Sequence, residues 1–148
     1  MSQGRVEGIF IGPPGELPGP VDRVHAVAGR GLEGNRYFLD EPEPGVALTL
    51  IEAEALEGLE RDTGIRLSAA ESRRNVLTRG IDLNALVGKQ FRVGAAECLG
   101  VELCEPCSSL EGMTQPGVIR GLVHRGGLRA DIVSDGEIRV GDAVAAAE

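Results

Sequence analysis

Residues 46–64 read VALTLIEAEALEGLERDTG and join a compact apolar strand to the most convincing helix of the chain. Thr49 and Glu52 have the spacing of a capping box, in which side chains satisfy the first free N–H groups of a helix. The stripe that would face the core at helical spacing consists of Ala53, Leu56 and Leu59. Gly64 is a favourable residue for ending a helix. The sequence therefore predicts one helix between this strand and Gly64.

Most other segments are short, and their apolar residues alternate or cluster as in strands. The expected strands are 6–11, 21–27, 46–51, 75–78, 89–93, 97–103, 118–123, 129–134 and 138–144. One helical turn is expected at 81–86, and Asp135-Gly136 predicts a hairpin between two strands. The chain also holds 22 Gly and 8 Pro, which favour turns. About seven to nine strands with one or two short helices predict a mainly β (α+β) fold, a closed or nearly closed β-barrel.

Length and composition limit the class of protein. A chain of 148 residues is one domain of ordinary size, and its 42% hydrophobic residues suffice for a packed core. No run approaches the ~18 apolar residues of a membrane span. The N-terminus lacks the basic segment and apolar run of a secretory signal. We therefore expect a cytoplasmic protein that is not bound to a membrane.

The chain has a negative net charge, and nearly all of its basic residues are Arg. The formal net charge is −8, which argues against general binding of nucleic acid or anionic lipid. Fourteen of the fifteen basic residues are Arg, and Lys89 is the single Lys. Arg is the side chain best suited to bidentate recognition of phosphate or carboxylate. A local anion site is therefore compatible with the acidic total.

The segment ELCEPCSS at 102–109 is the first candidate site. Pro106 prevents the preceding strand from continuing as a central strand, so Cys107 is expected on a loop just past a strand end. Its thiol could be a nucleophile or a soft metal ligand. Cys104 and Cys107 could instead form half of a zinc site or a redox pair, or all three cysteines could be ordinary buried thiols. Cys98, within a strand, is interpreted as a core residue.

The second candidate is the run Arg73-Arg74-Asn75, which precedes a short strand. Adjacent strand residues point to opposite faces, so Arg73 and Asn75 are expected on one face and Arg74 on the other. Two consecutive guanidinium groups are often only a solvated surface feature. An Arg beside an Asn can, however, bind one phosphate or carboxylate through charge-assisted hydrogen bonds.

Two glycine-containing loops supply further cations. The loop 29–36 carries Arg36, and the loop 124–129 carries Arg125 and Arg129. Glycines permit the positive φ and the close backbone approach that anion-binding loops need. His124 could carry a proton, although a lone His is more often a structural residue. The loop 29–36 is not a dinucleotide fingerprint, because no strand–turn–helix of suitable length surrounds it.

Taken in order, these segments resemble the MOSC domain, the family named for the C-terminal domain of molybdenum cofactor sulfurase. The resemblance rests on short motifs spread over nearly the whole chain, 1–148, which is read as a single such domain. They are GLEGNR at 31–36, RRNV at 73–76, GIDL at 80–83, EPC at 105–107, RGGLR at 125–129 and GEIRVGD at 136–142.

The resemblance implies a β-rich barrel and a role linked to the molybdenum cofactor (molybdopterin). The functional Cys of the family matches Cys107, which would carry sulfur as a persulfide or bind molybdenum directly. Arg73 and Asn75 match the positions that hold the phosphate end of the pterin, and Arg36, Arg125 or Arg129 would complete that pocket. One alternative is a small molybdenum-dependent reductase of N-hydroxylated compounds; under that alternative the protein would be an oxidoreductase. Another is a non-catalytic binding module.

Two departures and two partners follow from the same resemblance. The glycine loop of the family has Asp and His where this chain has Asn35 and Tyr37, which removes a carboxylate and an imidazole. A domain without fused partners is expected to receive sulfur from a pyridoxal-phosphate-dependent donor, or electrons from an electron-transfer protein. Pyridoxal phosphate itself is not expected on this chain, because a Schiff base would need Lys89 and no phosphate-binding motif lies beside it.

Overall fold

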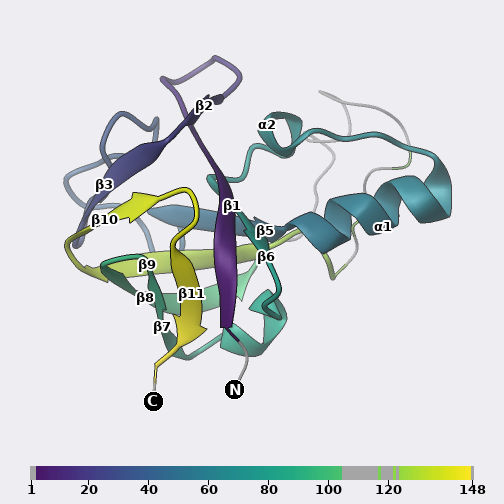
Figure 1. The fold of residues 1–148 in the computed structure, drawn as a ribbon. Helices are drawn as coiled ribbons and strands as arrows, with labels where there is room; N and C mark the ends of the chain where they lie inside the picture. The colour runs from purple at the N-terminus through teal and green to yellow at the C-terminus, as the bar shows by residue number, and fades with distance from the viewer. Residues whose placement is uncertain (1–2, 105–116, 118–121, 123, 148) are drawn as a thin grey trace.

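The computed structural model describes residues 3–104, 117, 122 and 124–147 and shows a β-barrel with its helices gathered on one side (Figure 1). The elements are β1 (Gln3–Ile11), β2 (Gly19–Val21), β3 (Arg23–Val27), β4 (Gly31–Leu32), β5 (Leu48–Glu52), α1 (Ala53–Thr63), α2 (Ala69–Ser72), β6 (Val76–Arg79), a 3₁₀ turn (Leu83–Leu86), β7 (Gln90–Val93), β8 (Ala96–Leu103), β9 (Leu128–Ser134), β10 (Gly136–Arg139) and β11 (Ala143–Ala146). Within these described ranges, no helix is long and apolar enough to cross a membrane.

Seven strands close the barrel in the order β11-β7-β8-β9-β5-β6-β1, and β1 pairs with β11 to complete the ring. Every pairing is antiparallel except β5–β6, which is parallel. That parallel pair needs a crossover, and the crossover contains α1 and α2. β2 extends the sheet beside β1, while β10, β3 and β4 form a second small sheet. The predicted mainly β barrel is therefore confirmed.

Alternating side chains fill the barrel as the sequence pattern predicts. In β7, for example, Phe91 and Val93 are buried while Gln90 and Arg92 are exposed. The largest cluster of buried apolar side chains includes Val6, Ile9, Leu48, Leu50, Val76, Phe91, Cys98, Leu128, Ile132 and Val144. Burial of such side chains contributes roughly 1.5–3 kcal/mol each, so this cluster is the main source of stability.

The helix α1 forms where the sequence predicts it but begins differently. Gly64 ends it with a left-handed φ of 77°, as expected. The predicted capping box is wrong: Glu52 is the N-cap residue without a side-chain cap, and Thr49 lies within β5. The carboxylate of Glu52 instead accepts a hydrogen bond from the backbone N–H of Leu83, at 3.0 Å. A capping box is present at α2, between Ser68 and Glu71.

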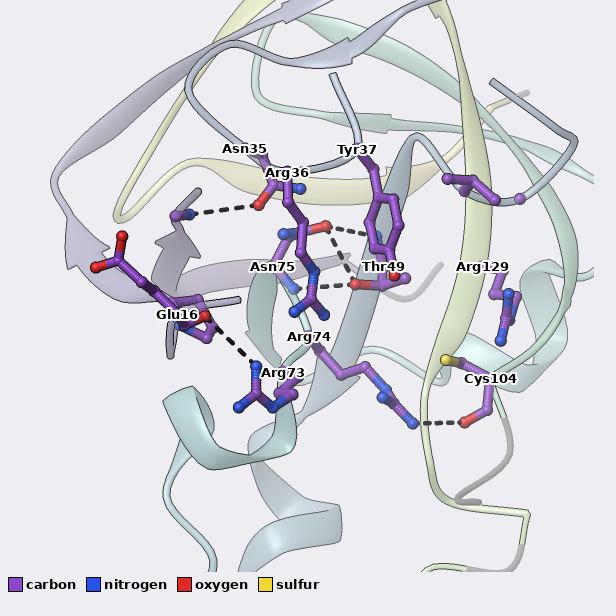
Figure 2. A pocket seen from close by; sticks show the side chains of 14 residues that line it. Glu16, Asn35, Arg36, Tyr37, Thr49, Arg73, Arg74, Asn75, Cys104 and Arg129 are labelled. Carbon is purple, nitrogen blue, oxygen red and sulfur yellow. Dashed lines mark hydrogen bonds between the residues drawn. The ribbon is translucent and has the colours of Figure 1, made fainter. Parts of the chain in front are cut away.

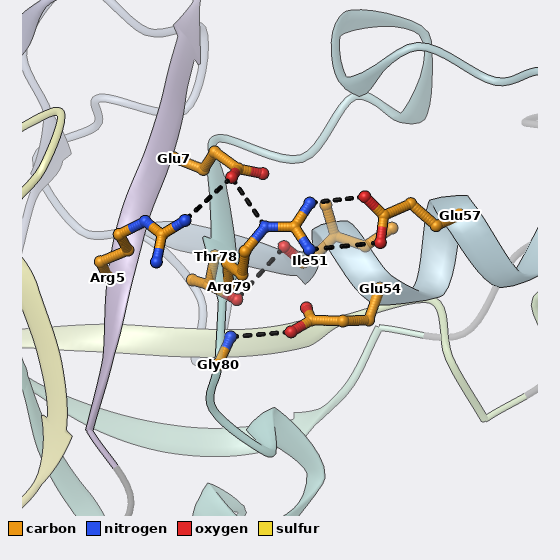
Figure 3. A network of polar contacts seen from close by, with 8 residues as sticks. All are labelled: Arg5, Glu7, Ile51, Glu54, Glu57, Thr78, Arg79 and Gly80. Carbon is orange, nitrogen blue, oxygen red and sulfur yellow. Dashed lines mark hydrogen bonds and ion pairs between the residues drawn. The ribbon is translucent and has the colours of Figure 1, made fainter.

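An ion-pair network fixes α1 against the barrel wall (Figure 3). The guanidinium of Arg79 on β6 donates to Glu7 on β1 at 2.7 Å and to both carboxylate oxygens of Glu57 on α1, at 3.2 and 2.5 Å. Glu54 accepts from the backbone N–H of Gly80 at 2.8 Å. The hydrogen bond from Arg79 lowers the pKa of Glu57 below its usual value. The ion pairs therefore hold α1 to β6, the strand that follows the run Arg73-Arg74-Asn75.

Three expected strands differ from those observed. Asp135-Gly136 does not form a hairpin between its neighbours, because β9 pairs with β5 and β8 whereas β10 pairs with β3. The expected strand 138–144 is divided into β10 and β11, and the strand 21–27 is divided at Asp22 into β2 and β3. Of the expected strand 118–123 only Leu122 is described, and its backbone is helical.

Gly127 provides a test of the close packing behind β9. Its φ is 111°, and a Cβ there would lie 2.0 Å from the carbonyl oxygen of Leu50. We expect Gly127→Ala to lower the free energy of unfolding by about 2 kcal/mol or more, because strain and overlap act together. Gly64→Ala is the control, since its φ is also positive but nothing lies within 4 Å. Equal losses in urea unfolding of the two variants would contradict the close contact.

Candidate functional site

A pocket of about 160 Å³ lies at one end of the barrel, where loops from distant parts of the chain meet (Figure 2). It receives residues from the β1–β2 loop, the loop after β4, strand β5, the α2–β6 junction, the end of β8 and strand β9. The lining residues are Gly12, Glu16, Pro18, Asn35, Arg36, Tyr37, Gly45, Val46, Thr49, Arg73, Arg74, Asn75, Cys104 and Arg129. The candidate residues Arg36, Arg73, Asn75 and Arg129 are therefore brought together.

Arg73 reaches the pocket from an unusual backbone position. It is the C-cap residue of α2, with a left-handed φ of 62°, and its backbone N–H donates to the carbonyl of Ala70 at 3.1 Å. Its guanidinium donates to the backbone carbonyl of Glu16 at 3.4 Å. The expectation that Arg73 and Arg74 point to opposite faces of a strand is wrong, because β6 begins only at Val76 and both residues line the pocket.

Arg74 connects three segments of backbone. Its guanidinium donates to the carbonyls of Gly126 at 2.7 Å, Ser72 at 3.1 Å and Cys104 at 3.1 Å. Cys104 is also held through its own N–H, which donates to the carbonyl of Gly127 at 2.7 Å. The residue just past the end of β8 is thus fixed from two sides.

Asn75 is buried and joins three strands of the barrel through its side chain. Its Oδ1 accepts from the backbone N–H and from the hydroxyl of Thr49, both at 3.1 Å. Its Nδ2 donates to the carbonyl of Phe10 at 3.2 Å. An amide nitrogen has two hydrogens, so one donor of Asn75 is left for a ligand in the pocket. The Asn75 side chain therefore mainly holds strands together. Only the remaining N–H of its Nδ2 is available to contact an anion.

Within the described chain, three arginines of the pocket lack the carboxylate partners that most other arginines have. Among the residues that the structure describes, Arg36, Arg73 and Arg129 form no ion pair, and the guanidinium of Arg36 lies over the ring of Tyr37, 5.0 Å from its centroid. Ion pairs to Asp or Glu are made by Arg5, Arg30, Arg61, Arg66, Arg79, Arg92, Arg125 and Arg139. The pocket thus concentrates positive charge in an acidic protein.

Asn35 adds an unused donor to the same wall. The residue is only 8% exposed, and its Oδ1 accepts from the N–H of Gly12 at 3.4 Å. Its Nδ2 has no hydrogen-bond partner within the described part of the chain. A buried, unsatisfied N–H costs about 1–3 kcal/mol, so an acceptor supplied by a ligand would relieve it. An Asp at this position would instead repel an anion.

Other candidate residues lie outside the pocket. Arg125 pairs with Asp62 of α1 at 3.6 Å and is not among the described residues that line the pocket, so the structure does not bring it together with the other candidate residues. The exposed His25 on β3 and His124, which has a φ of 60°, also lie outside the lining. No group of three or more His, Cys, Asp or Glu that could hold a metal occurs among the described residues.

The three cysteines differ in where they lie. Cys107 lies outside the described residues, so its predicted place in the site stays a prediction. Cys98 is a core residue as expected: it is fully buried, and burial raises its pKa to about 12. For Cys104 the sequence permits either a site thiol or an ordinary buried thiol. The residue is 4% exposed and lines the pocket. Sequence reasoning also missed Thr49 and Arg74, although Arg74 sits between two residues that it had selected.

Comparison with known proteins places this chain in a family. The family described as MOSC domain matches residues 41–145, and the chain belongs to that family. No curated protein sequence matches the chain. The fold is similar to the YUAD protein from Bacillus subtilis, with a TM-score of 0.84, 17% identity and 97% of each chain covered.

Two further solved structures share the fold over most of their length. YiiM from Geobacillus stearothermophilus matches with a TM-score of 0.77 and 18% identity, covering 98% of this chain and 75% of that one. YiiM from Escherichia coli matches with a TM-score of 0.71 and 18% identity, covering 97% and 70% respectively. At these identities the likeness establishes the barrel fold and not an activity.

Asn75 provides the test of the site's framework. Asn75→Ala removes one donor to Phe10 and the acceptor for two donors of Thr49, so we expect the free energy of unfolding to fall by about 2–4 kcal/mol. Thr49→Val is the matched control. It removes the hydroxyl, which donates to Asn75 Oδ1 and accepts from the Asn75 N–H, but leaves the bonds of the Asn75 amide to Phe10 and to the backbone N–H of Thr49, so its effect should be smaller. If the two variants unfold at the same urea concentration, the amide does not hold these strands together.

Proposed function

We propose that this MOSC domain binds the phosphate-bearing end of the molybdenum cofactor in the pocket and that Cys107 is the thiol beside it. Arg73 and the free donor of Asn75 would hold the phosphate, with Arg36 and Arg129 on the opposite sides. When bound, the cofactor would supply a molybdenum centre able to take a thiolate or sulfur ligand. The family membership and the pocket both support this proposal.

The observation that carries the proposal is the set of guanidinium groups without an ion pair that line one small cavity of the described chain. Three arginines without carboxylate partners, drawn from three separate segments, surround it within the described chain. A phosphate would accept charge-assisted hydrogen bonds from them, and such bonds contribute roughly 1.5–3 kcal/mol each. The buried Nδ2 of Asn35 would add a neutral donor.

The size of the cavity is compatible with an anionic end group. Pockets that enclose a complete drug-sized ligand measure roughly 300–1,000 Å³. The present cavity of about 160 Å³ is smaller, so it would take a phosphate and its immediate neighbours while the rest of a pterin lies outside. The residues present therefore fit the phosphate end of such a cofactor.

Cys107 is proposed to carry sulfur by exchange with a persulfide-bearing donor protein. The Cys107 thiolate would attack the outer sulfur of the donor persulfide; a new S–S bond forms, the donor S–S bond breaks, and the donor regains its thiolate. A pyridoxal-phosphate-dependent donor generates such persulfides. The arginines of the pocket would attract the anionic acceptor of the sulfur to this loop.

Binding of phosphate tests the anion site. Arg73→Ala removes one charge-assisted contact, so we expect inorganic phosphate to bind about 10- to 100-fold more weakly in a titration followed by NMR. Arg92→Ala is the control, because Arg92 pairs with Glu97 on the strand surface outside the pocket. Unchanged affinity in Arg73→Ala would contradict the assignment of this residue.

Sulfur loading tests Cys107 directly. After incubation with a persulfide donor, intact mass spectrometry should show the gain of one sulfur atom, which a reductant removes. Peptide mapping should place the sulfur on Cys107, and Cys107→Ser should lose it. An unchanged adduct in that variant would show that another thiol carries the sulfur. Metal analysis of the purified protein provides the parallel test for molybdenum.

A further inference from the structure

Cys104 differs from the other buried cysteine in what surrounds it. Cys98 packs within the main apolar cluster of the barrel, whereas Cys104 belongs to neither of the two clusters of buried apolar side chains. It is free of any disulfide and lines the arginine-rich pocket. Figure 2 shows its Sγ turned toward the interior on the side of Arg129, with its carbonyl turned toward Arg74.

Two hydrogen bonds hold the backbone of Cys104. The guanidinium of Arg74 binds its carbonyl at 3.1 Å, and its N–H donates to Gly127 at 2.7 Å. Both bonds fix the Cα–Cβ direction, so the thiol is kept facing the cavity. Asn35 lines the same cavity, and its buried Nδ2 has no hydrogen-bond partner within the described part of the chain. An anion is the ligand that would satisfy that donor and Arg129 together.

We infer that Cys104 is a second functional thiol, which meets the soft, thiol-reactive atom of an anionic ligand held by Arg129 and Asn35. The inference rests on the proposed anion site but not on Cys107 or on molybdenum. It gives Cys104 a task distinct from the sulfur-carrying one: contact with the reacting atom of a ligand already seated in the pocket. The ligand class is a small anion bearing an electrophilic carbon, a sulfane sulfur or a soft metal.

Alkylation with a charged and a neutral reagent tests this inference. Iodoacetate and iodoacetamide both form an S–C bond with release of iodide and of the thiol proton, but only iodoacetate is an anion. The measured quantity is the ratio of the alkylation rate with iodoacetate to the rate with iodoacetamide. In a Cys107→Ser background, we expect this ratio for Cys104 to be at least about 10-fold higher than for 2-mercaptoethanol, because the arginines raise the local anion concentration. Inorganic phosphate should protect Cys104, and peptide mapping should find Cys98 unlabelled.

Arg129→Gln supplies the matched variant. The iodoacetate-to-iodoacetamide rate ratio of this variant should fall toward that of 2-mercaptoethanol, because one of the pocket's cations is lost. Urea unfolding confirms that the variant folds. If it does not fold, protection by phosphate in the protein that retains Arg129 decides. Absence of labelling at Cys104, or labelling without preference for the anion, would overturn the inference. Failure of sulfur loading with retained anion-directed labelling would overturn only the role of Cys107. Failure of both phosphate binding and labelling would overturn the anion site.

Discussion

The hydrogen bonds of the Asn75 amide are the constraint on which the site depends. They join Phe10 of β1 and Thr49 of β5 to the residue that enters β6, at the single parallel pairing of the barrel. A parallel pair must be separated by a crossover, so a long excursion containing α1 and α2 returns to the sheet at this residue. The amide fixes the point of return, and Arg73 and Arg74 are thereby placed over the barrel end.

Charge is distributed in a way that suits the same end of the barrel. In an acidic chain, most arginines are neutralised locally, as Arg79 is by Glu7 and Glu57 (Figure 3). Exposed pairs of this kind contribute little stability each, and they mainly remove positive charge from the surface. Among the described residues, Arg36, Arg73 and Arg129 form no ion pair, so an anion is attracted to this end of the barrel of an acidic protein.

The sequence predicts the barrel well because alternation and apolar clustering report directly on burial, as in Phe91 and Val93 of β7. It predicts strand partners poorly, since pairing depends on residues far apart; Asp135-Gly136 looks like a hairpin, yet β10 pairs with β3. Of the site, Arg36, Arg73, Asn75 and Arg129 were found from residue type and motif. The expected orientation of Arg74 is wrong because β6 starts only at Val76. The position of Cys104 depends on its backbone carbonyl, which accepts a hydrogen bond from Arg74.

The backbone of Arg73 carries a consequence for how this protein would respond to selection. Arg73 ends its helix with a left-handed φ of 62°, a conformation that glycine normally adopts. A residue with a Cβ in this conformation lowers the stability of the fold by roughly 1–2 kcal/mol relative to glycine. Screening for heat resistance alone would therefore favour glycine at this position and erase a cation of the pocket. Arginine at residue 73 therefore places a cation in the pocket at a cost in fold stability.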